Sequence, residues 1–118
     1  MFQENFPLKQ ISHYKIGGEA KYFYLAKNAE EIIKAIEGAR QLGVPVFILA
    51  GASNVLIDDS GVSGLVIKPD IKSFEILGFK ARVGVGVPMN QLLNDLMTEN
   101  LSGLEWSAGI PGTIGGAI

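Results

Sequence analysis

A strand, a helix and a second strand are predicted in succession near the start of the chain. Residues 20–26 are rich in aromatic side chains, which is typical of a strand. Asn28 stands three residues before Glu31, the spacing of a helix N-cap and its capping-box partner. Apolar residues recur at helical spacing as far as Gly43, a C-cap candidate, and the apolar run 46–50 predicts a buried second strand. Strand, helix and strand within about thirty residues form a βαβ unit, so we expect a parallel pair of strands with a right-handed crossover.

A small polar loop follows the second of these strands directly, and it consists of Gly51, Ala52, Ser53 and Asn54. Ligands of parallel α/β units bind just outside the carboxyl ends of the strands, so this loop is a candidate binding site. A plain tight turn is the alternative. Ser53 is expected to donate a hydrogen bond rather than to act as a nucleophile. A nucleophile elbow needs glycine where this chain has Val55, and a single histidine argues against a Ser-His-acid triad.

A further strand is predicted at 64–68, followed by a hairpin with arms at 73–77 and 80–87. In the second arm the alanine and valines at 81, 83, 85 and 87 share one face, and Gly84 and Gly86 share the other. Bare glycines on a strand allow the close approach of a ligand or of another backbone.

A helix is expected to begin at Pro88 and to end near Asn100. Its buried stripe is formed by Met89, Leu92, Leu93, Leu96 and Met97. The change of pattern near residues 69–73 predicts two units, residues 1–70 and residues 71–118.

The last part of the chain is rich in glycine and carries no charged side chain from Ser107 onward. The dipeptide Ile110–Pro111 is surrounded by Gly109, Gly112, Gly115 and Gly116. Exposed N–H groups in such a loop suit phosphate oxygens or the edge of a flat heterocycle, because glycine tolerates φ > 0 and proline stiffens the loop. Nearby, Trp106 is expected to pack beside Leu104 rather than to stack on a ligand. Because the chain stops inside this loop, we expect it to be part of a longer protein.

Composition excludes several classes of function. A net charge of −2 gives no electrostatic basis for nucleic-acid binding. There is no cysteine, so disulfides, thiolate metal sites and thiol catalysis are excluded, which fits a cytoplasmic protein. No apolar run approaches the ~20 residues of a membrane span, and the first ten residues lack the pattern of a signal peptide.

Several other motifs favour structural roles. His13 is expected to lie in an exposed loop and Asp58–Asp59 in a solvated turn, so no metal site is expected. The segment Lys15–Gly18 is either a ligand-facing loop or the entry turn to the first strand. The pair Gly84 and Gly86 is not a dinucleotide fingerprint, because position 89 is methionine rather than glycine or alanine.

Three segments together resemble one family. They are residues 14–18 (YKIGG), 48–57 (ILAGASNVLI) and 103–117 (GLEWSAGIPGTIGGA), in this order and spacing. They are similar to the UDP-N-acetylenolpyruvoylglucosamine reductases (UDP-N-acetylmuramate dehydrogenases), cytoplasmic flavoenzymes of peptidoglycan synthesis. The third segment is the most specific, and the resemblance covers essentially the whole chain.

The resemblance implies an α+β fold of the vanillyl-alcohol-oxidase (PCMH) type, with two small α/β lobes, the second of them truncated, and FAD between them. It implies that FAD, reduced by NADPH, passes hydride to UDP-N-acetylglucosamine enolpyruvate and gives UDP-N-acetylmuramate. The implied FAD contacts are Gly51, Ala52, Ser53, Asn54, Ile110, Pro111, Gly112, Thr113, Gly115 and Gly116. The FAD is expected to be non-covalent, because cysteine is absent and the only histidine is expected to lie far from both loops. The alternatives are another flavoprotein of this fold, such as an oxidase of alcohols or hydroxy acids, and a binding module without enzymatic activity.

The chain departs from the family pattern at two places. The family has a run of glycines where this chain has Ala50, Gly51 and Ala52, and a positive φ at Ala52 would strain the loop. The pair Ser12–His13 replaces two hydroxyl residues. The catalytic residues of the family match no position of this chain, so none is assigned, and the 118 residues alone are expected to be inactive.

Overall fold

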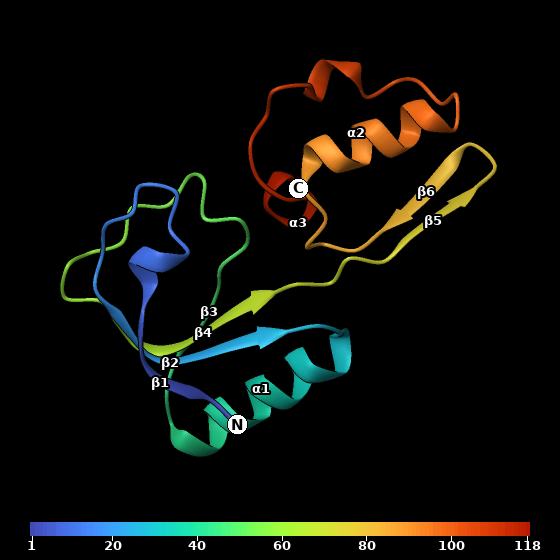
Figure 1. Ribbon diagram of the computed structural model, residues 1–118. Coiled ribbons are helices and arrows are strands. Elements are labelled where there is room, and N and C mark those ends of the chain that lie inside the picture. Colours follow the sequence, from blue (N-terminus) through green and yellow to red (C-terminus); the bar gives the residue numbers. More distant parts are fainter.

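The computed structural model describes all residues from 1 to 118 and contains two sheets (Figure 1). The first sheet has four strands in the order β1-β2-β4-β3. Its strands are β1 (Gln3–Pro7), β2 (Glu19–Ala26), β3 (Val46–Ile48) and β4 (Val62–Pro69). β1 runs antiparallel to β2, whereas β2 and β3 both pair in parallel with β4. The second sheet is the antiparallel hairpin of β5 (Phe74–Leu77) and β6 (Lys80–Val83).

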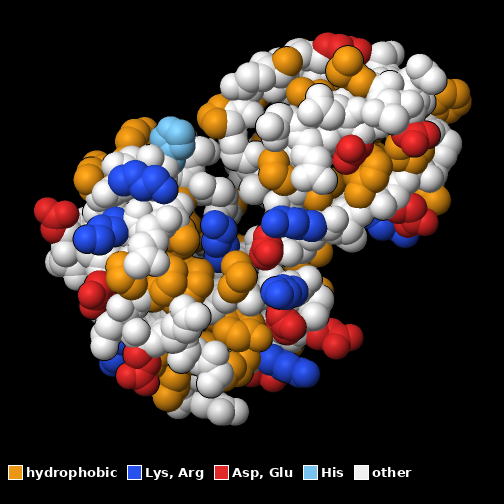
Figure 2. Space-filling model, viewed as in Figure 1, with side chains coloured by type: hydrophobic (Ala, Val, Ile, Leu, Met, Phe, Trp, Pro, Cys, Tyr) orange, Lys and Arg blue, Asp and Glu red, His pale blue; other side chains and the backbone are white.

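The molecule is elongated, with extents of 47 × 30 × 17 Å. The four-stranded sheet and α1 (Ala29–Leu42) form one part, and the hairpin with α2 (Met89–Thr98) forms the other. In the space-filling view the two parts meet at a narrow waist (Figure 2). None of the helices combines the length and the apolar character that a membrane crossing needs.

The helix predicted after Asn28 is confirmed, together with the residues predicted to cap its two ends. The side chain of Asn28 accepts a hydrogen bond of 2.8 Å from the N–H of Glu31. The Glu31 carboxylate accepts from the N–H of Lys27, one residue before the N-cap, at 2.7 Å. Gly43 ends the helix with φ +66°, and its N–H donates to the carbonyls of Ala39 and Arg40. Local sequence therefore sets both ends of α1.

The two strands expected to form a pair are parallel, but they are not neighbours. β4 lies between β2 and β3, so the prediction of a paired βαβ unit is wrong in its strand order. The prediction that residues 46–50 form a buried strand is also wrong, because Phe47 and Ile48 are 48% and 56% exposed. The central position, covered on both faces, belongs to β4, whose residues 65–67 are almost completely buried.

Each face of the sheet carries its own hydrophobic cluster. On the α1 side the buried members are Ala26, Ala35, Ala39, Leu65 and Ile67. On the opposite side they are Leu8, Ala20, Phe23, Leu49, Ala52, Ile57 and Val66, with Leu8 contributed by the short helix η1 (Leu8–Gln10). Successive residues of β4 point to opposite faces, as the pleat requires. The second cluster includes Ala52, so the loop that follows β3 is attached to the core of the sheet.

The second arm of the hairpin is shorter than predicted. β6 ends at Val83, and at Gly84 and Gly86 the chain turns against the segment that precedes β5. The N–H of Gly84 donates to the carbonyl of Ser73 at 2.7 Å, and that of Gly86 donates to the carbonyl of Ile71 at 2.9 Å. A Cβ at Gly84 would collide with the Ile71 carbonyl oxygen. These glycines therefore accommodate another backbone, which decides between the two alternatives left open by the sequence.

The helix expected after Pro88 is confirmed as α2, with Pro88 at its N-cap. Met89 and Leu92 are buried and Leu96 is partly buried, whereas Met97 is 70% exposed and does not belong to the buried stripe. The expectation for Trp106 is wrong as well. Trp106 lies in the short helix η2 (Glu105–Ser107) and is 73% exposed, because that single turn presents its side chain to solvent.

Candidate functional site

The two loops predicted to form a site lie against each other. Residues 50–54 follow β3, and residues 111–116 lead into the short helix α3 (Ile114–Ala117). They line one cavity of about 330 Å³, which nine of the ten predicted site residues share. The exception is Ile110, which is not part of the lining. Ala50 also lines the cavity, although the sequence did not single it out as a site residue.

Glycines allow the two main chains to approach this closely. A Cβ at Gly51 would lie 3.3 Å from the Cα of Gly112, and one at Gly116 would lie 3.2 Å from the Cβ of Ala50. Gly112 has φ +105°, and a Cβ there would lie 2.9 Å from the Oγ of Ser53. Because these glycines have no side chains, the two loops can pack directly against each other.

The second loop is anchored to the start of α2. The N–H of Met89 donates to the carbonyl of Gly112 at 3.0 Å, and the N–H of Ile114 donates to the carbonyl of Val87 at 2.9 Å. The N–H of Gly115 donates to the carbonyl of Val85, also at 2.9 Å. These bonds hold the loop against residues 85–89, and a Cβ at Gly115 would lie 2.8 Å from the Cβ of Val85.

Residues that line the cavity carry hydrogen-bond donors that the protein itself does not use. Main-chain N–H groups at positions 51, 52, 53, 54, 112 and 113 donate to no main-chain carbonyl. The Thr113 Oγ1 is buried and has no hydrogen-bond partner. Neither loop carries a charged side chain. An unpaired buried polar atom is unfavourable, and clustered N–H donors suit the oxygens of an anion.

Ala52 adopts the left-handed conformation that was expected to strain the loop, at a position where the family has glycine. Its φ is +54°, and the residue is only 4% exposed. Its carbonyl accepts a hydrogen bond of 3.1 Å from the N–H of His13. The expectation that His13 lies far from both loops is therefore wrong, because β1 and η1 return the chain to the end of the sheet where the loop lies. The side chain of His13 is exposed, as expected.

Ser12, beside His13, is a second buried hydroxyl without a partner. It lies outside the cavity lining. The neighbouring segment Lys15–Gly18 is an entry turn, because Gly18 donates its N–H to the carbonyl of Asp58 and a Cβ at Gly17 would lie 2.7 Å from the Cβ of Ile57. Packing against residues 57–61 thus explains both glycines.

A metal centre finds no support. No three His, Cys, Asp or Glu side chains come together in the structure. Asp58 lies in a solvated turn, where the hydroxyl and the N–H of Ser60 donate to its Oδ1 and lower the pKa of the Asp58 carboxyl.

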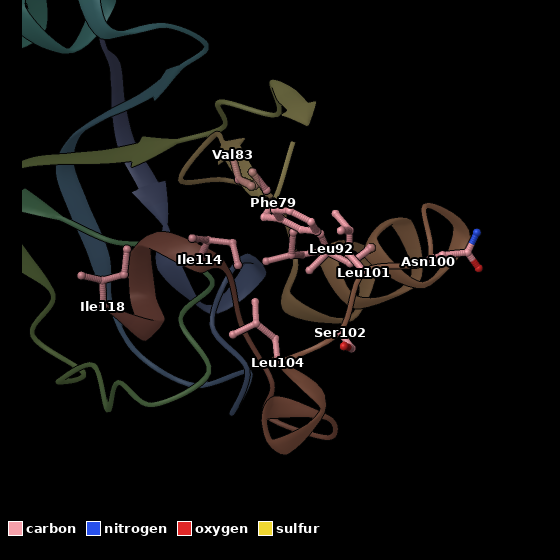
Figure 3. Close-up of a pocket in the computed structure, with 11 residues that line it drawn as sticks. Phe79, Val83, Leu92, Asn100, Leu101, Ser102, Leu104, Ile114 and Ile118 are labelled. Atoms are coloured by element: carbon pink, nitrogen blue, oxygen red, sulfur yellow. The ribbon is translucent and has the colours of Figure 1, made fainter. Parts of the chain in front are cut away.

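A larger cavity of about 520 Å³ lies between β6, α2 and residues 100–104 (Figure 3). Its lining is mostly hydrophobic, with Phe79, Leu92 and Leu104 among the side chains drawn in the close-up. None of the ten predicted site residues lines it. Because its lining is mostly hydrophobic and includes none of those ten residues, we place the candidate site at the two loops.

Comparison with known proteins identifies the family of this chain. The family described as "FAD binding domain" matches residues 20–118. The UDP-N-acetylenolpyruvoylglucosamine reductase of Streptococcus suis (strain 05ZYH33) is 34% identical over 113 residues, covering 95% of this chain and 37% of that protein. The reductase of the same name from Lactobacillus helveticus (strain DPC 4571) is 35% identical, covering 98% of this chain and 39% of that protein.

A solved structure shows the same architecture. UDP-N-acetylenolpyruvylglucosamine reductase from Thermus caldophilus superposes with a TM-score of 0.82 at 30% identity, covering 99% of this chain and 41% of that chain. The chain thus spans 37% to 39% of the length of the curated relatives described above. Together with the match over residues 20–118, the structural likeness shows that the chain belongs to the FAD binding domain family, with a fold of the vanillyl-alcohol-oxidase type.

Proposed function

We propose that the cavity between residues 50–54 and 111–116 binds the pyrophosphate of FAD. The observation that carries this proposal is the set of free N–H donors beside the buried, unpaired hydroxyl of Thr113. Phosphate oxygens accept hydrogen bonds from such donors without a charged side chain. Ser53 and Asn54 would add polar contacts, and the exposed Ile110 would lie with Pro111 against the flavin ring edge.

We further propose that the chain is the FAD-binding portion of a UDP-N-acetylenolpyruvoylglucosamine reductase. Support comes from the likeness of the chain to the reductases of Streptococcus suis, Lactobacillus helveticus and Thermus caldophilus. The enzyme would act in the cytoplasm, reduce UDP-N-acetylglucosamine enolpyruvate with NADPH and give UDP-N-acetylmuramate for peptidoglycan. Bound FAD supplies hydride transfer, and the residues of this chain bind and orient it. None of them is assigned a catalytic role.

Residues 1–70 and 71–118 would act as two lobes that hold the cofactor between them. In support of this division, one sheet ends at Pro69 and the other begins at Phe74. The cavity takes its lining from both sides of this boundary, because it includes Ala50 and Gly112. A cofactor that spans the boundary would therefore stabilise the arrangement of the two parts.

The proposed function is tested by binding and by turnover. We expect the purified chain to bind added FAD and to release it as free FAD after denaturation. Flavin that stays on the denatured polypeptide would contradict non-covalent binding and would implicate His13, which lies beside the Ala52 loop.

Residues 1–118 alone should show no substrate-dependent oxidation of NADPH. Such oxidation above a flavin-only control would contradict the absence of catalytic residues.

Thr113→Val should have opposite effects on stability and on flavin binding. Removing an unpaired buried hydroxyl is expected to raise the free energy of unfolding of the flavin-free protein by about 1 kcal/mol. Losing a hydrogen bond to an anionic oxygen should weaken FAD binding on the order of tenfold. Urea unfolding and a fluorescence titration with FAD measure the two quantities.

The matched control for Thr113→Val is Ser12→Ala. It removes the other buried, unpaired hydroxyl, which lies outside the cavity lining. We expect a similar gain in stability and an unchanged dissociation constant for FAD. If both variants, or neither, weaken FAD binding, the hydroxyl of Thr113 has no specific role toward the flavin.

A further inference from the structure

Four residues other than glycine have a left-handed backbone: Asn5, Lys15, Ala52 and Asn100, with φ between 52° and 58°. Three of them are exposed, and only Ala52 is buried. Asparagine tolerates this conformation because its short amide bonds to the neighbouring backbone. Alanine has no such compensation, so its presence at a buried left-handed position needs another explanation.

The surroundings of Ala52 supply one. The residue belongs to the cluster of Leu8, Leu49, Ile57 and other apolar side chains on one face of the sheet. Its carbonyl is held by the N–H of His13 at 3.1 Å. Its own N–H and those of its neighbours donate to no main-chain carbonyl, and these residues line the cavity. The methyl group thus points into the core while the N–H groups remain available to a ligand.

We propose that Ala52 is a positioning residue for the flavin site, an inference that rests on the proposed function. Its buried methyl holds the main chain of residues 51–54 in the conformation that presents N–H donors to the pyrophosphate. Glycine at this position would relieve the left-handed strain, but it would also release the anchor. The flavin-free loop would then sample conformations that cannot bind, and the apparent affinity falls with the binding-competent fraction.

The test compares Ala52→Gly with Asn100→Gly, which replaces an exposed left-handed residue after α2. Ala52→Gly removes the buried methyl that anchors the loop, and losing this attachment should lower the binding-competent fraction and weaken FAD binding about two- to fivefold in spite of the relieved strain. The loss should appear in the association rate, with an unchanged dissociation rate, because the bound loop is the same. Asn100→Gly should leave both rates unchanged. Stopped-flow fluorescence gives the two rates, and urea unfolding confirms that both variants are folded.

Two results would overturn the inference in different ways. If Ala52→Gly binds FAD as tightly as the wild-type chain, or more tightly, Ala52 is a strained residue that the fold tolerates, and it does not position residues 51–54. If the wild-type chain itself fails to bind FAD, the proposed function is overturned and the inference with it. The wild-type titration therefore separates failure of the site from failure of the role assigned to Ala52.

Discussion

Replacing Gly112 by valine is expected to lower the affinity for FAD on the order of 100-fold, because losing two hydrogen bonds to a charged group, each contributing about 1.5 kcal/mol, has an effect of that size. Gly112 has φ +105°, and its missing Cβ would lie 2.9 Å from the Oγ of Ser53. A side chain at this position would push the second loop away from the first. The N–H donors at positions 53 and 113 could then no longer reach one pyrophosphate. Equilibrium titration of the variant with FAD, followed by flavin fluorescence, measures the loss.

Gly103→Val provides the matched control. Gly103 also has a positive φ, +121°, but a Cβ there would meet no atom within 4 Å. Both variants carry a β-branched residue in a conformation that strains it, so both should lose stability. Only the variant at Gly112 should lose flavin affinity when the two are compared under conditions in which both are folded. Equal affinities in the two variants would show that the closeness of the two loops does not matter for binding.

The largest expected effect on stability is that of Gly61→Ala. Gly61 has φ +77°, and a Cβ there would collide with the carbonyl oxygen of Glu19 and lie 2.8 Å from its nitrogen. Both atoms belong to the main chain at the start of β2, so neither can move without disturbing the sheet. Strain and overpacking together should lower the free energy of unfolding by about 3 kcal/mol or more. That loss is a large part of the roughly 5–15 kcal/mol of an ordinary domain.

Gly43→Ala is the control that separates backbone strain from collision. Gly43 ends α1 with φ +66°, and a Cβ at this position would meet nothing within 4 Å. Only the conformational penalty remains, so we expect a loss of about 1 kcal/mol. Urea unfolding of both variants gives the comparison. Similar losses in the two proteins would mean that the contact between Gly61 and Glu19 is not as tight as the structure shows.

Local features of this fold could be predicted from the sequence, whereas the order of its strands could not. Asn28, Glu31 and Gly43 specify the ends of α1 through bonds to residues within one turn, and these bonds are present. The place of β4 between β2 and β3 depends on pairing between distant segments, which no local pattern encodes. For the same reason the apolar run 46–50 predicted a buried strand, although β3 is an edge strand with exposed side chains.

Much of the candidate site could be predicted because its signals are also local. A loop directly after a parallel strand and a glycine-rich segment without charge both pointed to backbone-mediated binding, and the structure brings the two together at one cavity. Contacts between residues that are far apart in the sequence could not be predicted. The sequence did not reveal that Ala52 is buried against the core, that His13 holds its carbonyl, or that Gly84 packs against the backbone of Ile71.

The most direct test of the FAD site is a titration of ¹⁵N-labelled protein with FAD, followed through its backbone amide resonances. If the free N–H groups bind the pyrophosphate, the largest shifts should occur at Gly51, Ser53, Asn54, Gly112 and Thr113, which donate to no main-chain carbonyl. Residues of the larger cavity, such as Leu92 and Leu101, should move little. Large shifts around that cavity, with the amides of the two loops unchanged, would contradict the assignment of the FAD site.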